Sequence, residues 1–332
     1  MQNKKEKFSY SKLNVYNNCC WKYFLTYKEG HFINVESLAA DLGTTLHFIE
    51  ESIARSLKDH EEIDYEQLKN DFFNINIPKT SPYDTKGGIY GINILKEKYK
   101  EEFYKPDDNG VSYNSKIEDY MNFGIYRLEN YIKENPGLEV YDMEKFFSVD
   151  YKGHMLSGFI DRIFYNKNTG KYIIEDIKTK GKLFKDEELK TPLQFVVYMY
   201  ALHEGLGIPY EDIECYYDLP FCQTKQQAMM INFLDKDGEI KKLNHIFDGI
   251  DAKNYEPNPT PLCHWCNFCP TNPNQPEAGK NLCPYYSLWT RENKTHAVSH
   301  KWRGMESHES IMAHELKKQA QKEPKENEKI EL

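Results

Sequence analysis

The first part of the chain carries apolar residues at the spacing of amphipathic helices. This period predicts helices over residues 9–26, 36–58, 64–75, 88–104 and 114–134. The last of them is expected to end at the Asn-Pro-Gly sequence of residues 135–137, because proline does not continue a helix. We therefore expect a helical region over residues 1–135.

Strand patterns replace the helical period in the middle of the chain. Alternating apolar positions rich in β-branched and aromatic residues predict strands over residues 139–150, 154–165 and 171–179. A helix over 188–206, two β-like runs over 212–221 and 226–234, and a helix over 237–250 follow. Such an order predicts an α/β core over residues 136–255, in which a mixed sheet with three antiparallel strands is flanked by helices.

One predicted hairpin, "SGFIDRIFYNKNTGKYIIEDIKTKG" at residues 157–181, holds two acids and a lysine. Strand residues two apart share a face, so Asp176 and Lys178 are expected to point together. If "KNTG" is a four-residue loop, Asp161 lies directly opposite Asp176. Two carboxylates about 5 Å apart repel each other unless a cation lies between them. The hairpin therefore predicts a divalent metal site.

The residue types in this hairpin favour hydrolysis of phosphodiesters. Oxygen ligands select Mg²⁺ or Mn²⁺, and such an ion activates water and neutralises charge on phosphorus. Lys178 is placed to stabilise the transition state. Acids beside a lysine are more often ordinary surface salt bridges, but apolar neighbours such as Phe159 and Ile160 make a purely surface role less favourable here.

Charge is unevenly distributed along the chain. The formal net charge is −9, but lysines outnumber acids in residues 1–30, and lysines at 178, 180, 182 and 185 follow the hairpin acids. This favours a basic groove on an acidic body, with ordinary solvated surface as the alternative. No apolar stretch predicts a membrane span or a signal peptide, so we expect a soluble cytoplasmic protein.

Cysteines form a second group of candidate ligands. Cys263, Cys266 and Cys269 are each three apart in a loop rich in Pro and Asn, Cys283 follows, and Cys19 and Cys20 lie near the other end of the chain. Repeated C-x-x-C in such a loop predicts a metal site, and thiolates suit zinc or an iron-sulfur cluster equally well. The remaining two, Cys215 and Cys222, are expected to be buried thiols.

The order of these motifs resembles the RecB-type branch of the PD-(D/E)XK nucleases, and within it the iron-sulfur exonucleases typified by CRISPR-associated exonucleases and the AddB nuclease domain. The matching sequences are "GTTLH", "GFID", "EDIKT" and "QFVVY". The resemblance implies that Mg²⁺ or Mn²⁺ is held by His47, Asp161, Asp176 and the Ile177 carbonyl. It also implies that Lys178 is catalytic and that Gln194 and Tyr198 position DNA. Glu144 is similar to an acidic position on the preceding strand.

The same resemblance implies a 4Fe-4S cluster held by Cys19, Cys263, Cys266 and Cys283. Cys20 then stands where the family has proline, and Cys269 is the reserve ligand. The cluster would close the segment 256–290 on the N-terminus as a structural clasp, with zinc as the alternative.

The combined prediction is a metal-dependent exonuclease that acts on single-stranded or unwound DNA ends in recombination or repair, with a helicase or recombinase as a candidate partner. The alternative is a non-catalytic DNA-end-binding iron-sulfur scaffold subunit. Residues 291–332 are expected to be a charged, mobile tail.

Overall fold

The computed structural model describes residues 6–33, 35–78, 88–107, 109–258, 260–270, 272–280 and 282–283. The chain divides into two compact units. The first joins Met1–Tyr10 to Glu36–Ile240, and the second joins Ser11–Val35 to Lys241–Leu332. The predicted tail over residues 291–332 lies outside the described residues. Within the described ranges, no helix has the length and apolar character needed to cross a bilayer.

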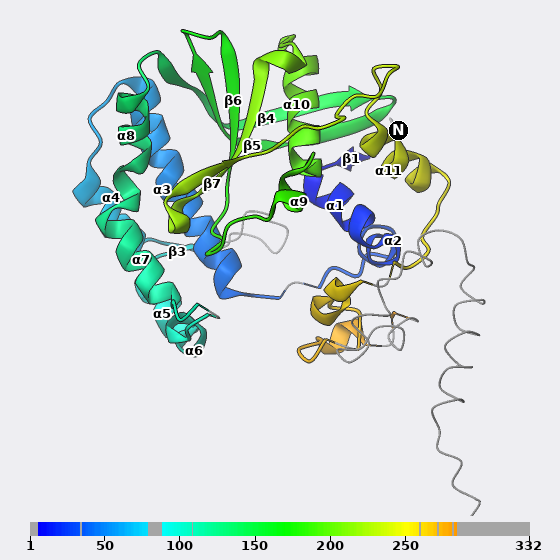
Figure 1. Cartoon of the computed structure of the whole chain (residues 1–332). Coiled ribbons are helices and arrows are strands. Elements are labelled where there is room, and N and C mark those ends of the chain that lie inside the picture. Colours follow the sequence, from blue (N-terminus) through cyan, green and yellow to red (C-terminus); the bar gives the residue numbers. More distant parts are fainter. Residues whose placement is uncertain are drawn as a thin grey trace, which may run out of the picture. The chain divides into compact units, whose positions relative to one another are not determined.

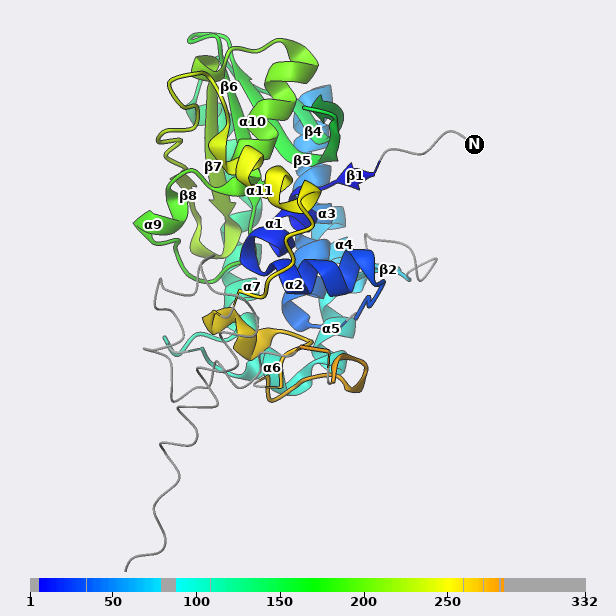
Figure 2. The same ribbon diagram turned by 90° about the vertical axis from the view of Figure 1, so that its right-hand side faces the viewer.

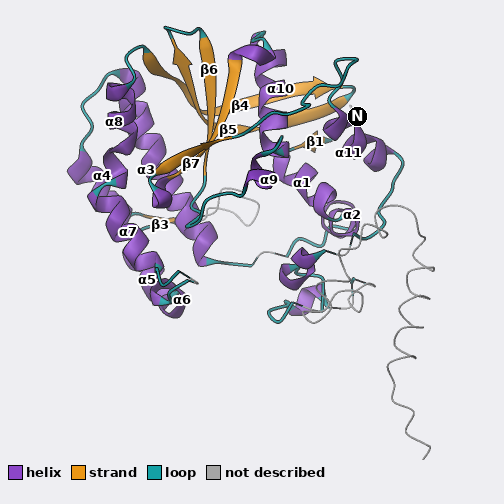
Figure 3. Ribbon diagram, in the orientation of Figure 1, coloured by secondary structure: helices purple, strands orange, loops and turns teal. Residues whose placement is uncertain are grey.

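A mixed sheet lies at the centre of the first unit (Figures 1 and 3). Its strands are β1 (Lys7–Phe8), β4 (Leu138–Tyr151), β5 (His154–Asn166), β6 (Lys171–Ile177), β7 (Ile213–Leu219) and β8 (Thr224–Gln227). Strands β4, β5 and β6 are antiparallel neighbours, β7 runs parallel to β6, and β8 runs antiparallel to β7. The predicted mixed sheet with three antiparallel strands is confirmed.

The N-terminal residues add a strand that the sequence did not predict. Strand β1 pairs in parallel with β5 at Met155 and Leu156. Strand β6 pairs with β5 only from Arg162 onward, so the backbone groups at the start of β5 are available to another partner. Residues 7–8 therefore belong to the sheet, although we expected them in a helical region.

The hairpin of β5 and β6 has the predicted register. Its ladder runs from Arg162↔Glu175 to Asn166↔Lys171, with residues 167–170 as the connecting loop. Asp161 and Asp176 are one position beyond the last pair of this ladder. At that point β5 and β6 stop pairing, which opens the backbone of both strands to other partners.

The helices of the first unit are α3 (Leu38–Asp59), α4 (Tyr65–Asn74), α5 (Ile92–Lys98), α6 (Lys100–Tyr104), α7 (Tyr113–Asn122), α8 (Arg127–Glu134), α9 (Asp186–Leu189) and α10 (Leu193–Leu206). Helix α3 begins where the Ser37 hydroxyl accepts a hydrogen bond from the Ala40 amide. Its apolar stripe is fully buried in a core shared with α4, α5, α7 and α8.

Helices α3 and α10 cover opposite faces of the sheet (Figure 2). On β6, Ile177 belongs to the apolar core around α3, whereas the neighbouring Asp176 is hydrogen-bonded to Gln194 of α10. Successive side chains of a strand point to opposite faces, so this contrast assigns one helix to each face. The end of β6 therefore lies between the two helices.

Several predicted elements are interrupted at identifiable residues. Helix α10 begins at Leu193 instead of residue 188, because Pro192 disfavours a helical backbone at Thr191, whose φ is 45°. The predicted helix over 114–134 breaks at Gly124, where a Cβ atom would lie 2.5 Å from the Tyr120 ring. Of the β-like run over 226–234, only the first two residues belong to a strand, because β8 ends at Gln227. Beyond this strand, the Met229 carbonyl accepts a hydrogen bond from the Thr191 amide.

The predicted helix over 88–104 is also divided. It becomes the short strand β3 (Ile89–Tyr90), which pairs with β2 (Asn76–Ile77), followed by α5 and α6. Tyr99, with φ of −121°, separates the two helices. The predicted strand over 171–179 ends at Ile177.

The second unit brings together segments from both ends of the chain. It contains most of α1 (Tyr10–Asn18), then α2 (Cys20–Tyr23), a π-helical turn (Phe24–Lys28) and α11 (Lys241–Asp251). The hydroxyl of Tyr16 donates to the Asn254 carbonyl at 2.7 Å, and the Trp21 indole donates to the Leu282 carbonyl at 3.0 Å. The predicted helix over 9–26 is thus interrupted at Cys19, which has extended backbone and caps α2.

Candidate active site

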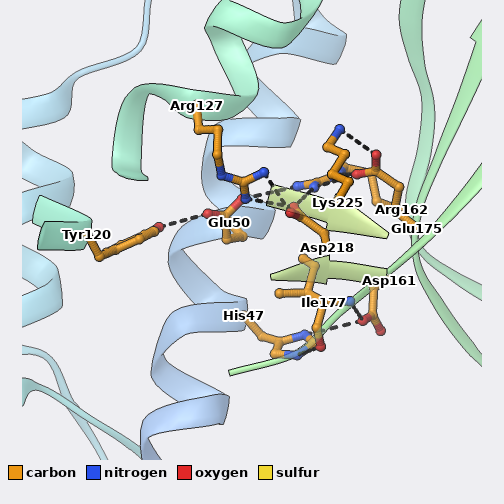
Figure 4. Close-up of polar contacts among 10 residues, drawn as sticks. All are labelled: His47, Glu50, Tyr120, Arg127, Asp161, Arg162, Glu175, Ile177, Asp218 and Lys225. Atoms are coloured by element: carbon orange, nitrogen blue, oxygen red, sulfur yellow. Dashed lines mark hydrogen bonds and ion pairs between the residues drawn. The ribbon is translucent and has the colours of Figure 1, made fainter. Parts of the chain in front are cut away.

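The point where β5 and β6 diverge holds the first part of the site (Figure 4). Asp161 accepts a hydrogen bond at Oδ2 from the Ile177 amide at 2.8 Å. His47 of α3 places Nε2 at 3.0 Å from the Ile177 carbonyl oxygen and Nδ1 at 3.7 Å from Asp161 Oδ2. The imidazole, the carboxylate and the carbonyl, which come from three different elements, therefore meet as the sequence predicted.

Glu144 of β4 completes a set of candidate metal ligands. Ligand atoms of His47, Glu144 and Asp161 all lie within 4.8 Å of one another. Glu144 lies between the pairs Met143↔Arg162 and Lys145↔Ile160, which places it opposite Asp161. Its φ of 44° is unfavourable for a side chain with a Cβ atom. Strained backbone of this kind is often found at functional sites.

Asp176 is the second acid of the hairpin, and both of its carboxylate oxygens have side-chain neighbours. Oδ2 lies 2.6 Å from Lys178 Nζ. Oδ1 accepts a hydrogen bond from the Gln194 amide, which also donates to the Tyr198 hydroxyl at 3.0 Å. The residues of "EDIKT" and "QFVVY" are thus joined in one polar chain. The set of candidate metal ligands described above contains Glu144 and does not contain Asp176. A role for Asp176 as a metal ligand therefore stays a prediction.

Burial and neighbouring charges shift the pKa values of the ionisable side chains in this polar chain. Burial raises the pKa of Asp176 to about 6, opposed by the nearby Lys178 and reinforced by Asp161. Burial disfavours the charged form of Lys178, but Asp176 and Asp161 outweigh it and raise its pKa. Burial also raises the pKa of Tyr198 well above its usual value. A cation beside these carboxylates would favour their ionised forms, so the donor set fits a divalent metal.

Two further residues near the site, Tyr10 and Gly43, have surroundings that the sequence motifs did not indicate. Tyr10, which follows β1, interacts electrostatically with Lys178 and Asp176, and burial raises its pKa. No motif marked it, because its position depends on the pairing of β1 with β5. At Gly43, a Cβ atom would lie 3.5 Å from Thr179 Oγ1, which is an ordinary contact. The glycine of the "GTTLH" sequence therefore makes no unusually close contact with another segment here.

A buried network of charges lies directly behind the site (Figure 4). Arg162 is 1% exposed and contacts three carboxylates, those of Glu50 at 3.1 Å, Glu175 at 2.7 Å and Asp218 at 2.5 Å. Arg127, Lys225 and the Tyr120 hydroxyl complete the network. Burial disfavours ionisation of Asp218, but the two guanidinium groups outweigh it and lower its pKa to about 2.

This network connects the elements that carry the site. Glu50 lies one turn after His47 on α3, Arg162 follows Asp161, and Glu175 precedes Asp176. On β7, the Asp218 carbonyl accepts a hydrogen bond from the Lys178 amide at 2.8 Å. Arg162 therefore fixes α3, β6 and β7 relative to β5. Sequence reasoning missed it, because an arginine after an aspartate carries no signal of its own.

A lysine-rich groove of about 750 Å³ begins at Lys178. It is lined by two aromatic rings, two acids and five lysines, namely Tyr113, Phe184, Glu102, Asp107, Lys105, Lys116, Lys178, Lys180 and Lys182. The Phe184 ring is held by stacking on Tyr217 at 4.2 Å, and Lys180 Nζ lies 3.8 Å from its centroid. Three of the lysines that follow the hairpin acids, at 178, 180 and 182, thus line this groove.

The cysteines near the two ends of the chain lie together in the second unit. Cys263 is hydrogen-bonded to Cys269, and both Cys263 and Cys266 interact electrostatically with Cys19. Cys283 follows Leu282, which is bonded to Trp21 close to Cys19. By contrast, Cys20 of α2 directs its thiol to the Tyr16 carbonyl of α1. Thiols from both ends therefore converge, which fits a thiolate-ligated cofactor.

The two remaining cysteines lie in the first unit. Cys215 is 1% exposed, and burial raises its pKa, which confirms the prediction of a buried thiol. Cys222 is only half-buried, so the prediction of a buried thiol is wrong for this residue, whose Sγ lies 3.5 Å from the Lys180 carbonyl oxygen.

Comparison with known proteins identifies the family. The family model of the PD-(D/E)XK nuclease superfamily matches residues 7–271, so the chain belongs to this superfamily. The predicted superfamily and its α/β fold are confirmed, whereas the RecB-type branch and the iron-sulfur clasp stay predictions. Members of this superfamily hydrolyse phosphodiester bonds.

Other comparisons are more distant. No curated protein matches the chain. Among solved structures, 11 chains match. One of them is a crystal structure described as a "putative exonuclease" from Eubacterium rectale, with 14% sequence identity and a TM-score of 0.40 over 80% of this chain and 88% of that chain.

Proposed function

We propose that the protein is a divalent-metal-dependent exonuclease that acts on single-stranded or unwound DNA ends. The observation that carries this proposal is the convergence of His47, Glu144 and Asp161 beside the pair formed by the buried Asp176 and the partly exposed Lys178. The membership of the chain in a nuclease superfamily supplies the reaction class. A role in recombination or repair, with a helicase or recombinase partner, is consistent with such a substrate.

Each residue of the site has a distinct role in this proposal. His47, Glu144, Asp161 and the Ile177 carbonyl would hold Mg²⁺ or Mn²⁺, with Asp176 contributing when ionised. The bound ion would lower the pKa of water and neutralise charge on the phosphate. Lys178 donates hydrogen bonds to the attacking water or to the phosphate oxygens. Gln194 orients Asp176 and is itself held by Tyr198.

The lysine-rich groove supports a single strand as the substrate. Lysine ammonium groups attract the phosphate backbone, and exposed aromatic rings accept unpaired bases regardless of sequence. In the groove that includes Lys178, five lysines occur together with the half-buried rings of Tyr113 and Phe184. A strand lying in this groove would reach the site with one end near Lys178.

A direct assay tests this function. Purified protein with Mn²⁺ is expected to shorten end-labelled linear single-stranded DNA and to leave circular single-stranded DNA intact, whereas Asp176→Ala degrades neither. Cleavage of the circle would show an endonuclease instead. Intact linear DNA, or equal cleavage by the variant, would support the alternative of a non-catalytic DNA-end-binding scaffold.

The cysteine group is proposed to hold a 4Fe-4S cluster through Cys19, Cys263, Cys266 and Cys283, with Cys269 in reserve. The ligands come from both ends of the chain, so a cluster would join these ends within the second unit. Zinc is the alternative occupant, since four thiolates also suit tetrahedral Zn²⁺.

Removing Cys263 tests the cluster and its structural role. Protein purified without oxygen is expected to be brown, and Cys263→Ser to lose this colour and most of its soluble yield, because the cofactor's binding energy contributes to folding. Cys215→Ser is the control, since Cys215 lies in the first unit. Colourless wild-type protein that contains zinc by elemental analysis would overturn the cluster.

A further inference from the structure

Two phenylalanines on the β4–β5 hairpin are exposed although they lie in the central sheet. Phe146 and Phe159 are directly paired across the strands, with ring centroids 5.3 Å apart. Their side chains are 52% and 44% exposed, whereas Phe147 and Phe164 of the same two strands are buried. Of the two apolar neighbours that made a surface role of the hairpin acids less favourable, Ile160 is buried but Phe159 is exposed. The pair forms an aromatic surface that the core does not use.

This aromatic pair lies next to the candidate metal ligands. Phe159 precedes Asp161 by two residues on β5, so both side chains point to the same side of the strand. The rise of a strand places their Cα atoms about 7 Å apart. Phe146 is brought to the same position by its pairing with Phe159. Both rings are thus carried by strand positions next to the candidate metal ligand Asp161.

Exposed rings beside a phosphate-processing site suit one kind of ligand. An unpaired nucleobase has an apolar face that stacks on aromatic side chains, and this stacking tolerates any base. The site itself is formed by carboxylates and a lysine, which contact phosphate and metal but offer no face for a base. The lysine-rich groove is lined by residues of the α6–α7 region and of the loop after β6, so it does not include the pair.

We propose that Phe146 and Phe159 form a stacking platform for the nucleobase adjacent to the scissile phosphate. This inference rests on the proposed nuclease function and adds the residues that hold the base. The platform recognises an unpaired base of any identity, and it does not accept a base that is still within a duplex. It therefore gives the enzyme a preference for single strands at the reaction centre itself.

Substrates that lack single bases test the platform. Oligodeoxynucleotides carrying one abasic nucleotide near either end are compared with the intact oligodeoxynucleotide. For wild type, the abasic position is expected to lower kcat/KM by about tenfold, which is within the range for loss of one stacked base. Phe159→Leu is expected to lower kcat/KM on intact DNA by a similar factor and to cleave both substrates equally. Phe159→Trp is expected to retain the discrimination.

The control variant is Phe123→Leu, because Phe123 is also an exposed phenylalanine of the first unit, at 65%, but lies outside the hairpin. It should behave as wild type. If Phe159→Leu still discriminates against abasic DNA, or loses activity equally on both substrates, the platform is wrong.

Failure of the platform can be separated from failure of the proposed function. If wild type cleaves no DNA, the nuclease proposal fails, and the platform is then tested by fluorescence anisotropy with the same oligodeoxynucleotides in Ca²⁺. Tighter binding of intact than of abasic DNA, lost in Phe159→Leu, would support the platform. Equal binding of both would overturn it.

Discussion

Asp161→Asn is expected to lower the rate of DNA hydrolysis by at least about 10³-fold while leaving the fold intact. The metal supplies several kcal/mol of transition-state stabilisation, and each 1.36 kcal/mol corresponds to about tenfold in rate. The amide oxygen of asparagine can still accept the hydrogen bond that the Ile177 amide donates to Asp161 at 2.8 Å. The loss should therefore appear in activity and in Mn²⁺ affinity measured by calorimetry, with little change in melting temperature.

The matched control for this variant is Asp150→Asn. Asp150 also accepts a backbone hydrogen bond at 2.8 Å, from the Gly153 amide in the turn between β4 and β5. It lies away from His47 and Glu144 in the hairpin, so activity and Mn²⁺ affinity should be unchanged. Full activity of Asp161→Asn, or an equal loss in Asp150→Asn, would exclude Asp161 as a metal ligand.

Arg162→Met is expected to lower the free energy of unfolding by about 3–5 kcal/mol, which is the usual effect of breaking a buried ion pair from one side. Methionine fills much of the volume but leaves Glu50, Glu175 and Asp218 without their central cation, and these side chains are at most 1% exposed. Arg162→Lys should recover only part of the stability, because an ammonium group cannot reproduce the planar fork of contacts. Urea unfolding measures both effects.

Two comparisons make this prediction specific. Arg55→Met removes an Arg–Glu ion pair of 2.6 Å on the surface of α3, where Arg55 is 61% exposed, and should cost less than about 1 kcal/mol. Adding Glu50→Gln to Arg162→Met should restore part of the lost stability, because Glu50 is a buried charge whose ion-pair partner is Arg162, whereas Glu175 also pairs with Lys225. A double variant less stable than Arg162→Met alone would contradict the network as described.

The register of the hairpin could be predicted from local features of the sequence. The loop at residues 167–170 and the alternation of side chains along two short strands fix which residues face each other. In the same way, Gln194 and Tyr198 are four residues apart in "QFVVY" and therefore share a face of α10. These patterns involve neighbours along the chain, so one sequence contains enough information to read them.

The interruptions of helices were partly readable and partly not. Proline at residue 192 carries a recognisable signal for the start of α10. The break near Gly124 depends on the ring of Tyr120, which needs the space that a Cβ atom would occupy. Packing of this kind overrides the helical period and cannot be deduced from it.

Taken by itself, the sequence determined the type of each main element, the order of the motifs and the acids and lysine that are proposed to perform the chemistry, because periodicity and spacing are local properties. Only the tertiary structure decided that Glu144 joins His47 and Asp161, that Arg162 unites three carboxylates, and that Phe159 is exposed beside them. These features depend on contacts between residues far apart in the chain. Such contacts form only when the sheet and helices pack, and no local pattern encodes them.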